Sequence, residues 1–192
     1  MRQQSRLALG FFVALILAAL VAPIQAASVA GVNVPDKVDV DGKSLALNGA
    51  GVRSKFFIKV YVGALYTAQK EAAGDKLLAA DAPWQMAFHF LYSVSKNQMC
   101  EAWSEGLTDN SPQASAQVKK DFTSLCDWMA EIPKGNVMRF TYVPGKGTTI
   151  EVNGAVKGTV AGKPSADAIL ATWVGPKPGP GGDFKKAVLG GK

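Results

Sequence analysis

The stretch from Leu45 to Thr67, LALNGAGVRSKFFIKVYVGALYT, constrains the fold of this chain more than any other. From Phe56 onward it is rich in aromatic and β-branched residues, which favour a pleated, buried surface, and the run is apolar on both faces. Gly49 and Gly51 precede it, and glycine permits positive φ or the close approach of another segment. The pattern predicts two apolar strands hinged at the glycines, with Arg53 at the bend and other elements covering both faces.

Arg53 opens this apolar run, and burying a guanidinium without a partner is costly. Its position leaves three possibilities. It reaches solvent, it awaits an anionic ligand, or it pairs with a carboxylate of the fold such as Asp81 or Glu101. In the last case Tyr61 would be an ordinary core aromatic whose hydroxyl finds a backbone carbonyl.

Residues 1–26 are predicted to be a secretory signal peptide. Arg2 and Arg6 supply the positive start, residues 7–21 the apolar segment, and Ile24-Gln25-Ala26 a cleavage site. The apolar segment is short for a membrane span, which needs roughly 20 residues, so an uncleaved anchor is the weaker alternative. We therefore expect a secreted, periplasmic protein without a stable membrane span.

Residues 27–192 have the size of a single domain. Removing Arg2 and Arg6 lowers the formal net charge from +6 to +4. No cluster of basic residues forms a track for a phosphate backbone, which excludes nucleic acid as a partner. Charge of this size allows a weak preference for anions, and the sequence identifies no protein partner.

Cys100 and Cys126 are the two cysteines of the chain. An even number in an exported protein predicts a disulfide between them, and the alternative is a pair of buried thiols that never meet. With one histidine, His89, and no CxxC motif, the chain is expected to bind no metal and no cofactor. Catalytic triads, P-loops and dinucleotide fingerprints are also missing from the sequence.

Turn and cap signals divide the rest of the chain into helices and strands. Helix starts are predicted at Ser95, where Gln98 completes a capping box, at Ser111, where Pro112 follows, and at Ser165. Strands are predicted at residues 84–92, 137–143, 148–152 and 156–160, the last two joined by the turn Asn153-Gly154. This order indicates an α+β domain with a large antiparallel sheet covered on one face by helices.

Several motifs resemble the chalcone isomerase-like family. They are GAGVR at 49–53, KVYVGALY at 59–66, VNGAVKGTVAG at 152–162, ADAILATWVG at 166–175 and AVLGG at 187–191. The resemblance covers nearly all of residues 27–192. It implies an open-faced sandwich, in which a large antiparallel sheet is backed by a helical layer with a ligand cleft between them.

In the fatty-acid-binding branch of that family, an arginine and a tyrosine hold a carboxylate at the inner end of an apolar cleft. The matching residues here are Arg53 and Tyr61, and a guanidinium with a phenol suits a carboxylate chemically. The resemblance thus implies a non-catalytic protein that binds a fatty acid or similar amphipathic carboxylate. Further lining residues are expected at Phe57, Phe88, Phe90, Trp103 and Trp173.

The flavonoid-cyclising branch implies an alternative, an isomerase that acts through Arg53, Tyr92 and Thr172. Two positions depart from the pattern of those enzymes. Tyr61 stands where they have threonine, and Met99 stands where they have asparagine, whose amide a thioether cannot replace. A second alternative is a structural or interaction protein without a small ligand.

Overall fold

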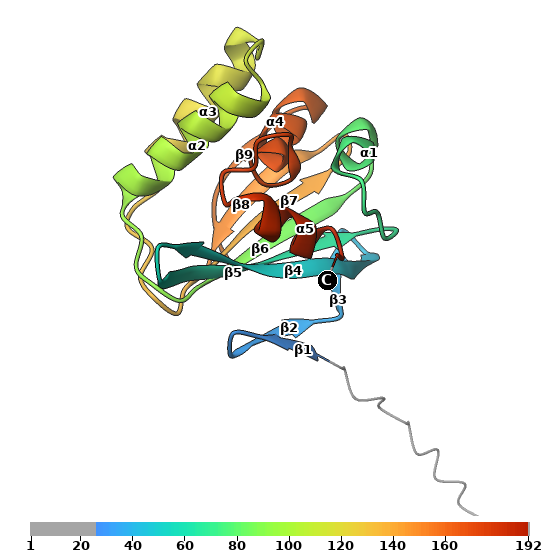
Figure 1. Cartoon of the computed structure of the whole chain (residues 1–192). Coiled ribbons are helices and arrows are strands. Elements are labelled where there is room, and N and C mark those ends of the chain that lie inside the picture. Colours follow the sequence, from blue (N-terminus) through green and yellow to red (C-terminus); the bar gives the residue numbers. More distant parts are fainter. Residues whose placement is uncertain (1–25, 192) are drawn as a thin grey trace, which may run out of the picture.

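The computed structural model describes residues 26–191, which form a curled seven-stranded antiparallel sheet with helices over one face (Figure 1). The predicted signal peptide, residues 1–26, lies outside the described residues except for Ala26. Within the described part of the chain, no helix has the length and apolar character required to cross a membrane.

The sheet is a simple meander, because each strand pairs with the strands that precede and follow it in the sequence. Its strands are β3 (Lys37–Val40), β4 (Lys43–Lys55), β5 (Ile58–Thr67), β6 (Trp84–Phe90), β7 (Val137–Val143), β8 (Gly147–Val152) and β9 (Ala155–Val160). Side chains alternate along them, so one face of β6 and β7 carries the large apolar residues Met86, Phe88, Met138 and Phe140. The predicted α+β architecture is confirmed.

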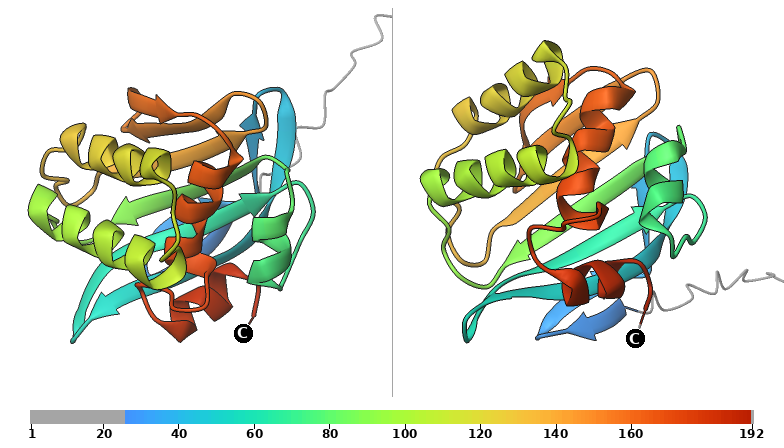
Figure 2. Two further views of the ribbon diagram at one scale, coloured as in Figure 1. Left: turned by 90° about the horizontal axis from the view of Figure 1, so that it is seen from above. Right: turned by 45° about the horizontal axis from the view of Figure 1, so that its top comes forward.

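Five helices cover that face: α1 (Gly74–Ala79), α2 (Lys96–Asn110), α3 (Ala116–Asp127), α4 (Lys163–Val174) and α5 (Gly182–Val188). Figure 2 shows α4 crossing the sheet between α1 on one side and the α2–α3 pair on the other. Every residue of α4 from Ala168 to Val174 is buried, which its apolar composition permits on all sides. Helix α4 is therefore the centre of the helical layer.

The Ser95 capping box is confirmed. The Gln98 amide N–H donates to Ser95 Oγ at 3.2 Å, and the Ser95 amide N–H donates to Gln98 Oε1 at 3.0 Å. The predicted start at Ser111 is wrong, since Ser111 lies at the C-terminal cap of α2 and α3 begins at Ala116. Ser115 caps α3 instead, accepting from an amide in its first turn.

The predicted start at Ser165 is also wrong, because α4 begins at Lys163 after Gly162. Ser165 is buried, and its hydroxyl donates to the carboxylate of Asp121 on α3. The serine therefore serves a contact between two helices, a use that a local capping pattern cannot reveal.

The bend between the two apolar strands does not lie at Arg53. Strand β4 continues to Lys55, so Arg53 is inside a strand and pairs with Tyr61 of β5. The chain turns at Phe56 and Phe57, which is why these two aromatic residues are exposed instead of buried. A shift in register just after Arg53 leaves Val60 as the extra residue of a β-bulge.

Gly49 and Gly51 serve the packing of α5 instead of forming a hinge. A Cβ added at Gly49 would lie 2.2 Å from the carbonyl oxygen of Ala187, and one at Gly51 would lie 2.9 Å from the Ala187 Cβ. Gly63 on β5 has the same use, because a Cβ there would lie 2.5 Å from the ring of Phe184. The three glycines let α5 lie directly on the β4–β5 pair.

The opposite face of the sheet is covered in part by the hairpin of β1 (Ala26–Val29) and β2 (Val32–Pro35). Val34 from this hairpin joins an apolar cluster with Leu45, Val62 and Tyr66. The expectation that both faces of the 45–67 stretch would be covered is therefore met, on one face by helices and on the other by a hairpin.

Cys100 of α2 and Cys126 of α3 form a disulfide, with their Cα atoms 5.3 Å apart. The predicted pairing is confirmed. The bridge ties together the two helices of the helical layer that lie farthest from α1 (Figure 2).

Candidate ligand-binding cleft

A cavity of about 340 Å³ lies between the sheet and the helices, beside the turn that joins β4 and β5. Its walls come from β4 to β7, from α2 and α4, and from the loop that follows α4. This volume falls at the lower end of the range of typical small-molecule sites, about 300–1,000 Å³. The cavity is thus large enough for a small organic ligand.

The polarity of the cavity changes from its floor to its rim. The buried lining side chains are apolar apart from one threonine, and they are Phe88, Phe90, Met99, Trp103, Met138, Thr172 and Trp173. The exposed lining residues are mostly polar or charged, and they include Lys55, Ser93, Gln98, Glu101 and Glu105. An amphipathic molecule would find an apolar surface at one end and polar groups at the other.

Arg53 lies in the wall of this cavity and is half-buried. Its Nη1 donates a hydrogen bond to the carbonyl oxygen of Gly179 at 2.7 Å. Among residues 26–191, no carboxylate is close enough to form an ion pair with it. Asp81, one expected partner, instead accepts a hydrogen bond from the Tyr142 hydroxyl at 2.6 Å. Because a guanidinium has five N–H donors, most of its capacity remains for another group.

Tyr61 lies opposite Arg53 on β5 and also lines the cavity. Its ring makes edge-to-face contacts with Phe88, Phe90 and Phe184, with centroids 5.0, 5.7 and 5.8 Å apart. Desolvation by this aromatic surround raises the pKa of Tyr61 to about 12, while the nearby Arg53 charge and the Trp173 side chain offset part of the rise. The phenol is therefore a neutral hydrogen-bond donor across the physiological pH range.

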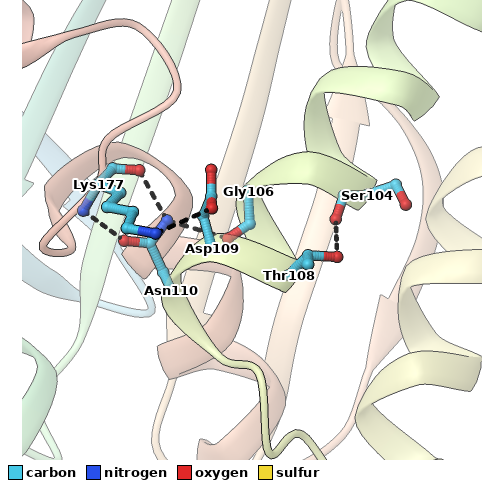
Figure 3. A network of polar contacts seen from close by, with 6 residues as sticks. All are labelled: Ser104, Gly106, Thr108, Asp109, Asn110 and Lys177. Atoms are coloured by element: carbon cyan, nitrogen blue, oxygen red, sulfur yellow. Dashed lines mark hydrogen bonds and ion pairs between the residues drawn. The ribbon is translucent and has the colours of Figure 1, made fainter.

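The loop after α4, residues 175–181, is held in place by Asn110 at the end of α2 (Figure 3). The Asn110 Nδ2 donates to the carbonyl oxygens of Gly106 at 2.9 Å and Lys177 at 2.8 Å, and its Oδ1 accepts from the Lys177 amide at 2.8 Å. The same loop supplies Gly179, the acceptor for Arg53. The amide of Asn110 thus fixes the backbone that orients the guanidinium.

Nine residues were expected to serve binding or catalysis, and all of them except Phe57 line this cavity. The eight lining residues are Arg53, Tyr61, Phe88, Phe90, Tyr92, Trp103, Thr172 and Trp173. Their contact with a ligand stays a prediction. Phe57 does not line the cavity, because it occupies the turn and its side chain is fully exposed.

The residues proposed for isomerase chemistry are less well arranged for it. The Thr172 hydroxyl donates to the carbonyl oxygen of Ile169 at 2.8 Å, one turn back in its own helix. Tyr92 is 53 % exposed at the rim. Met99, which lines the buried floor, presents a thioether where the cyclases have an amide.

Several lining residues were not predicted from the sequence. Gly179 and Pro180 belong to a loop whose approach to Arg53 is set by tertiary packing, over 126 positions of sequence. Glu101 and Glu105 face the cavity from α2, and Lys55 faces it from β4. The two glutamates have a sequence signal in their spacing, since they lie four residues apart on one helix face, and Glu101 was expected only as a possible partner of Arg53.

Among residues 26–191, no group of three or more His, Cys, Asp or Glu side chains is arranged to hold a metal ion. Beside its apolar floor, the cavity wall carries the guanidinium of Arg53 and the phenol of Tyr61.

Comparisons with known proteins bear on the fold and the family of the chain. No curated protein matches the sequence. The chain is similar in structure to a crystal structure of an Arabidopsis thaliana fatty-acid binding protein, with a TM-score of 0.67 and 19 % identity over 86 % of this chain and 96 % of that one. Residues 26–190 match the family model described as chalcone isomerase-like. With a match of that extent, the chain belongs to the chalcone isomerase-like family.

Proposed function

We propose that this protein is a non-catalytic binder of a fatty acid or similar amphipathic carboxylate, and that it works after secretion to the periplasm. The observation that carries the proposal is the environment of Arg53: a half-buried cation in a cavity wall, with an apolar floor beside it and a carbonyl as its protein acceptor. A carboxylate would satisfy its remaining donors through two parallel hydrogen bonds.

Tyr61 supports the same head-group position. Tyr61 on β5 pairs with Arg53 on β4, and its raised pKa keeps the phenol protonated, so that it can donate a hydrogen bond to the carboxylate. The apolar floor would then receive the acyl chain, and each buried methylene contributes about 0.8 kcal/mol of transfer free energy. Because the cavity is small for a ligand site, shorter acyl chains fit within it and longer ones extend toward the rim.

The periplasmic location rests on the leader-like residues 1–26 and on the disulfide, which is typical of proteins that leave the cytoplasm. The neighbouring Arabidopsis structure supports the ligand class, because it is described as a fatty-acid binding protein with this fold.

Titration of the purified protein with a medium-chain fatty acid tests the proposal. We expect saturable binding that Arg53→Ala weakens about ten- to a hundredfold, because hydrogen bonds to a charged group contribute about 1.5–3 kcal/mol. Lys59→Gln is the matched control, since Lys59 is an exposed cation of the same hairpin outside the cavity lining. Binding that Arg53→Ala leaves unchanged would contradict the head-group site.

The isomerase alternative has its own observation, namely that Arg53, Tyr92 and Thr172 line one cavity. It requires that the protein accelerate the loss of chalcone absorbance over the spontaneous rate, and that Arg53→Ala abolish this acceleration. With Met99 in place of an amide, we expect no such acceleration.

A further inference from the structure

The turn between β4 and β5 exposes three large apolar side chains in a row. Phe56 is 89 % exposed, Phe57 is fully exposed, and Ile58 is 46 % exposed. We call the segment from Lys55 to Lys59 the β4–β5 tip. Water-exposed aromatic pairs at a protruding turn are unfavourable unless another surface covers them.

The turn itself would be more stable with other residues. Residues 26–191 contain three further two-residue hairpin turns, Ala30-Gly31, Asp41-Gly42 and Asn153-Gly154, and both residues of each have positive φ with glycine second. In the β4–β5 tip, Phe56 instead adopts φ 55° without such a partner. A phenylalanine rarely adopts this conformation, so local stability does not explain these residues.

Along the chain, the charges beside the tip have one sign. Residues 42–70 contain no Asp or Glu, and Arg53, Lys55 and Lys59 lie at or beside the tip. Exposed aromatic side chains flanked by lysines match the interface of an anionic bilayer, where rings enter the headgroup layer and ammonium groups meet phosphates.

The tip is also continuous with the ligand cavity. Lys55, Phe56 and Ile58 line its rim, and the backbone amides of Leu91 and Tyr92 donate to the carbonyl oxygen of Val60, at 2.9 and 3.2 Å, just beyond the tip. The half-exposed Tyr92 is therefore held next to the tip, and tyrosine is a residue type enriched at membrane–water interfaces.

We propose that the β4–β5 tip inserts into the headgroup layer of an anionic lipid surface and places the mouth of the cavity against it. That this contact loads the cavity with a ligand rests on the proposed function. The membrane contact itself does not depend on the proposed function. Glu101 and Glu105, on the α2 side of the rim, would be repelled by anionic headgroups, so we expect the tip to enter the surface with the α2 side of the rim turned away from it. A protein partner fits less well, since a convex two-residue turn offers far less than the roughly 800 Å² per partner of a standard interface.

Co-sedimentation with vesicles of phosphatidylglycerol and phosphatidylcholine in equal parts tests the proposal. We expect the wild-type protein to bind, and binding to weaken with added salt and on vesicles of phosphatidylcholine alone. Phe57→Gly places a glycine second in the turn, as in the three other two-residue turns, so the variant should fold. It should lower the partition coefficient about tenfold or more. Lys59→Gln should lower it about fivefold.

Val156→Ser and Lys157→Gln are matched controls, because both residues are exposed on β9 at the other edge of the sheet, and both variants should bind vesicles like the wild type. Fatty-acid binding in solution should be unchanged in Phe57→Gly and Lys59→Gln, which separates failure of the membrane contact from failure of the ligand site. The proposal is overturned if the wild-type protein does not bind the anionic vesicles, if Phe57→Gly binds them equally well, or if Phe57→Gly merely converts a dimer into a monomer.

Discussion

At the scale of single residues, Tyr61 and Arg53 meet across paired strands, and their side chains complement each other. The cation attracts an anion, and the phenol, with its pKa raised to about 12, supplies a proton donor that does not itself ionise near neutrality. A carboxylate held between them would be recognised by its charge and by the direction of its lone pairs.

The substitution Tyr61→Phe should weaken fatty-acid binding about tenfold or more, because it removes one hydrogen bond to a charged acceptor and leaves the ring in place. Calorimetric titration at pH values from about 7 to about 9 should give the same difference in affinity between the wild type and Tyr61→Phe throughout, since the phenol remains protonated in that range. A difference that vanishes by the upper end of the range would show that the phenol ionises there.

His89 is the single histidine of the chain, and its pKa is lowered from the ordinary value of 6.5, first by desolvation and then by the nearby Arg139 charge. The unfolded chain therefore binds a proton at a pH where the folded protein still does not. Stability from this residue is present above about pH 6.5 and is lost as the pH falls below it.

Denaturant unfolding of the wild type and His89→Gln at several pH values checks this expectation. The wild-type free energy of unfolding should fall as the pH is lowered from about 7 to about 5, and it should fall less steeply with pH in the variant. Parallel curves for the two proteins would contradict the assignment to His89.

At the scale of elements, the approach of α5 to the β4–β5 pair places Phe184 against Tyr61, with ring centroids 5.8 Å apart. This approach requires glycine on the strands, because backbone atoms of α5 occupy the space that a Cβ at Gly49 would need. The glycines of the GAG motif therefore act on the cavity indirectly, through the helix that they admit.

The substitution Gly49→Ala should lower the free energy of unfolding by about 1–3 kcal/mol, the usual cost of forcing an extra methyl group into packed structure. Gly182→Ala is the control, because Gly182 is the first residue of α5 and nothing lies within 4 Å of its Cβ position. Thermal unfolding of both variants measures the difference, and equal melting temperatures would show that α5 shifts at little cost.

The elements also show where sequence patterns succeed. The meander from β7 to β9 follows from alternation and from the turn Asn153-Gly154, both local signals. The turn at Phe56 and Phe57 could not be found in this way, because aromatic residues in a turn look like the continuation of a buried strand. The helix start predicted at Ser165 was wrong for a related reason, since the Ser165 hydroxyl donates a hydrogen bond to Asp121 of another helix and caps no helix.

At the scale of the whole molecule, the cavity joins parts that are distant in sequence. The resemblance to a family indicated Arg53 and Tyr61, but the contact of Arg53 with the loop that carries Gly179 had no sequence signal, because the place of this loop depends on Asn110 and on the packing of α4. The extent of the cavity is likewise a property of how the elements leave space between them, which no local pattern encodes.

The disulfide closes a segment of the chain with a sequence separation of 26 between Cys100 and Cys126. Replacing both cysteines by serine should lower the free energy of unfolding by about 2–4 kcal/mol, chiefly because the unfolded chain gains freedom. Denaturant unfolding of the double variant measures the loss. Mass spectrometry after thiol alkylation should find no free thiols in wild-type protein isolated from the periplasm, and two free thiols there would contradict the disulfide.

The bond from Arg53 to Gly179 has a consequence for synthesis on the ribosome. A nascent chain that has emerged only as far as α3 carries the guanidinium and most of the apolar floor, yet it lacks α4 and the segment that closes the wall. The cavity is complete only when Gly179 and Pro180 have been translated. A chain threaded through a translocon before folding would accordingly arrive empty, and its first cargo would come from the side of the membrane on which it folds.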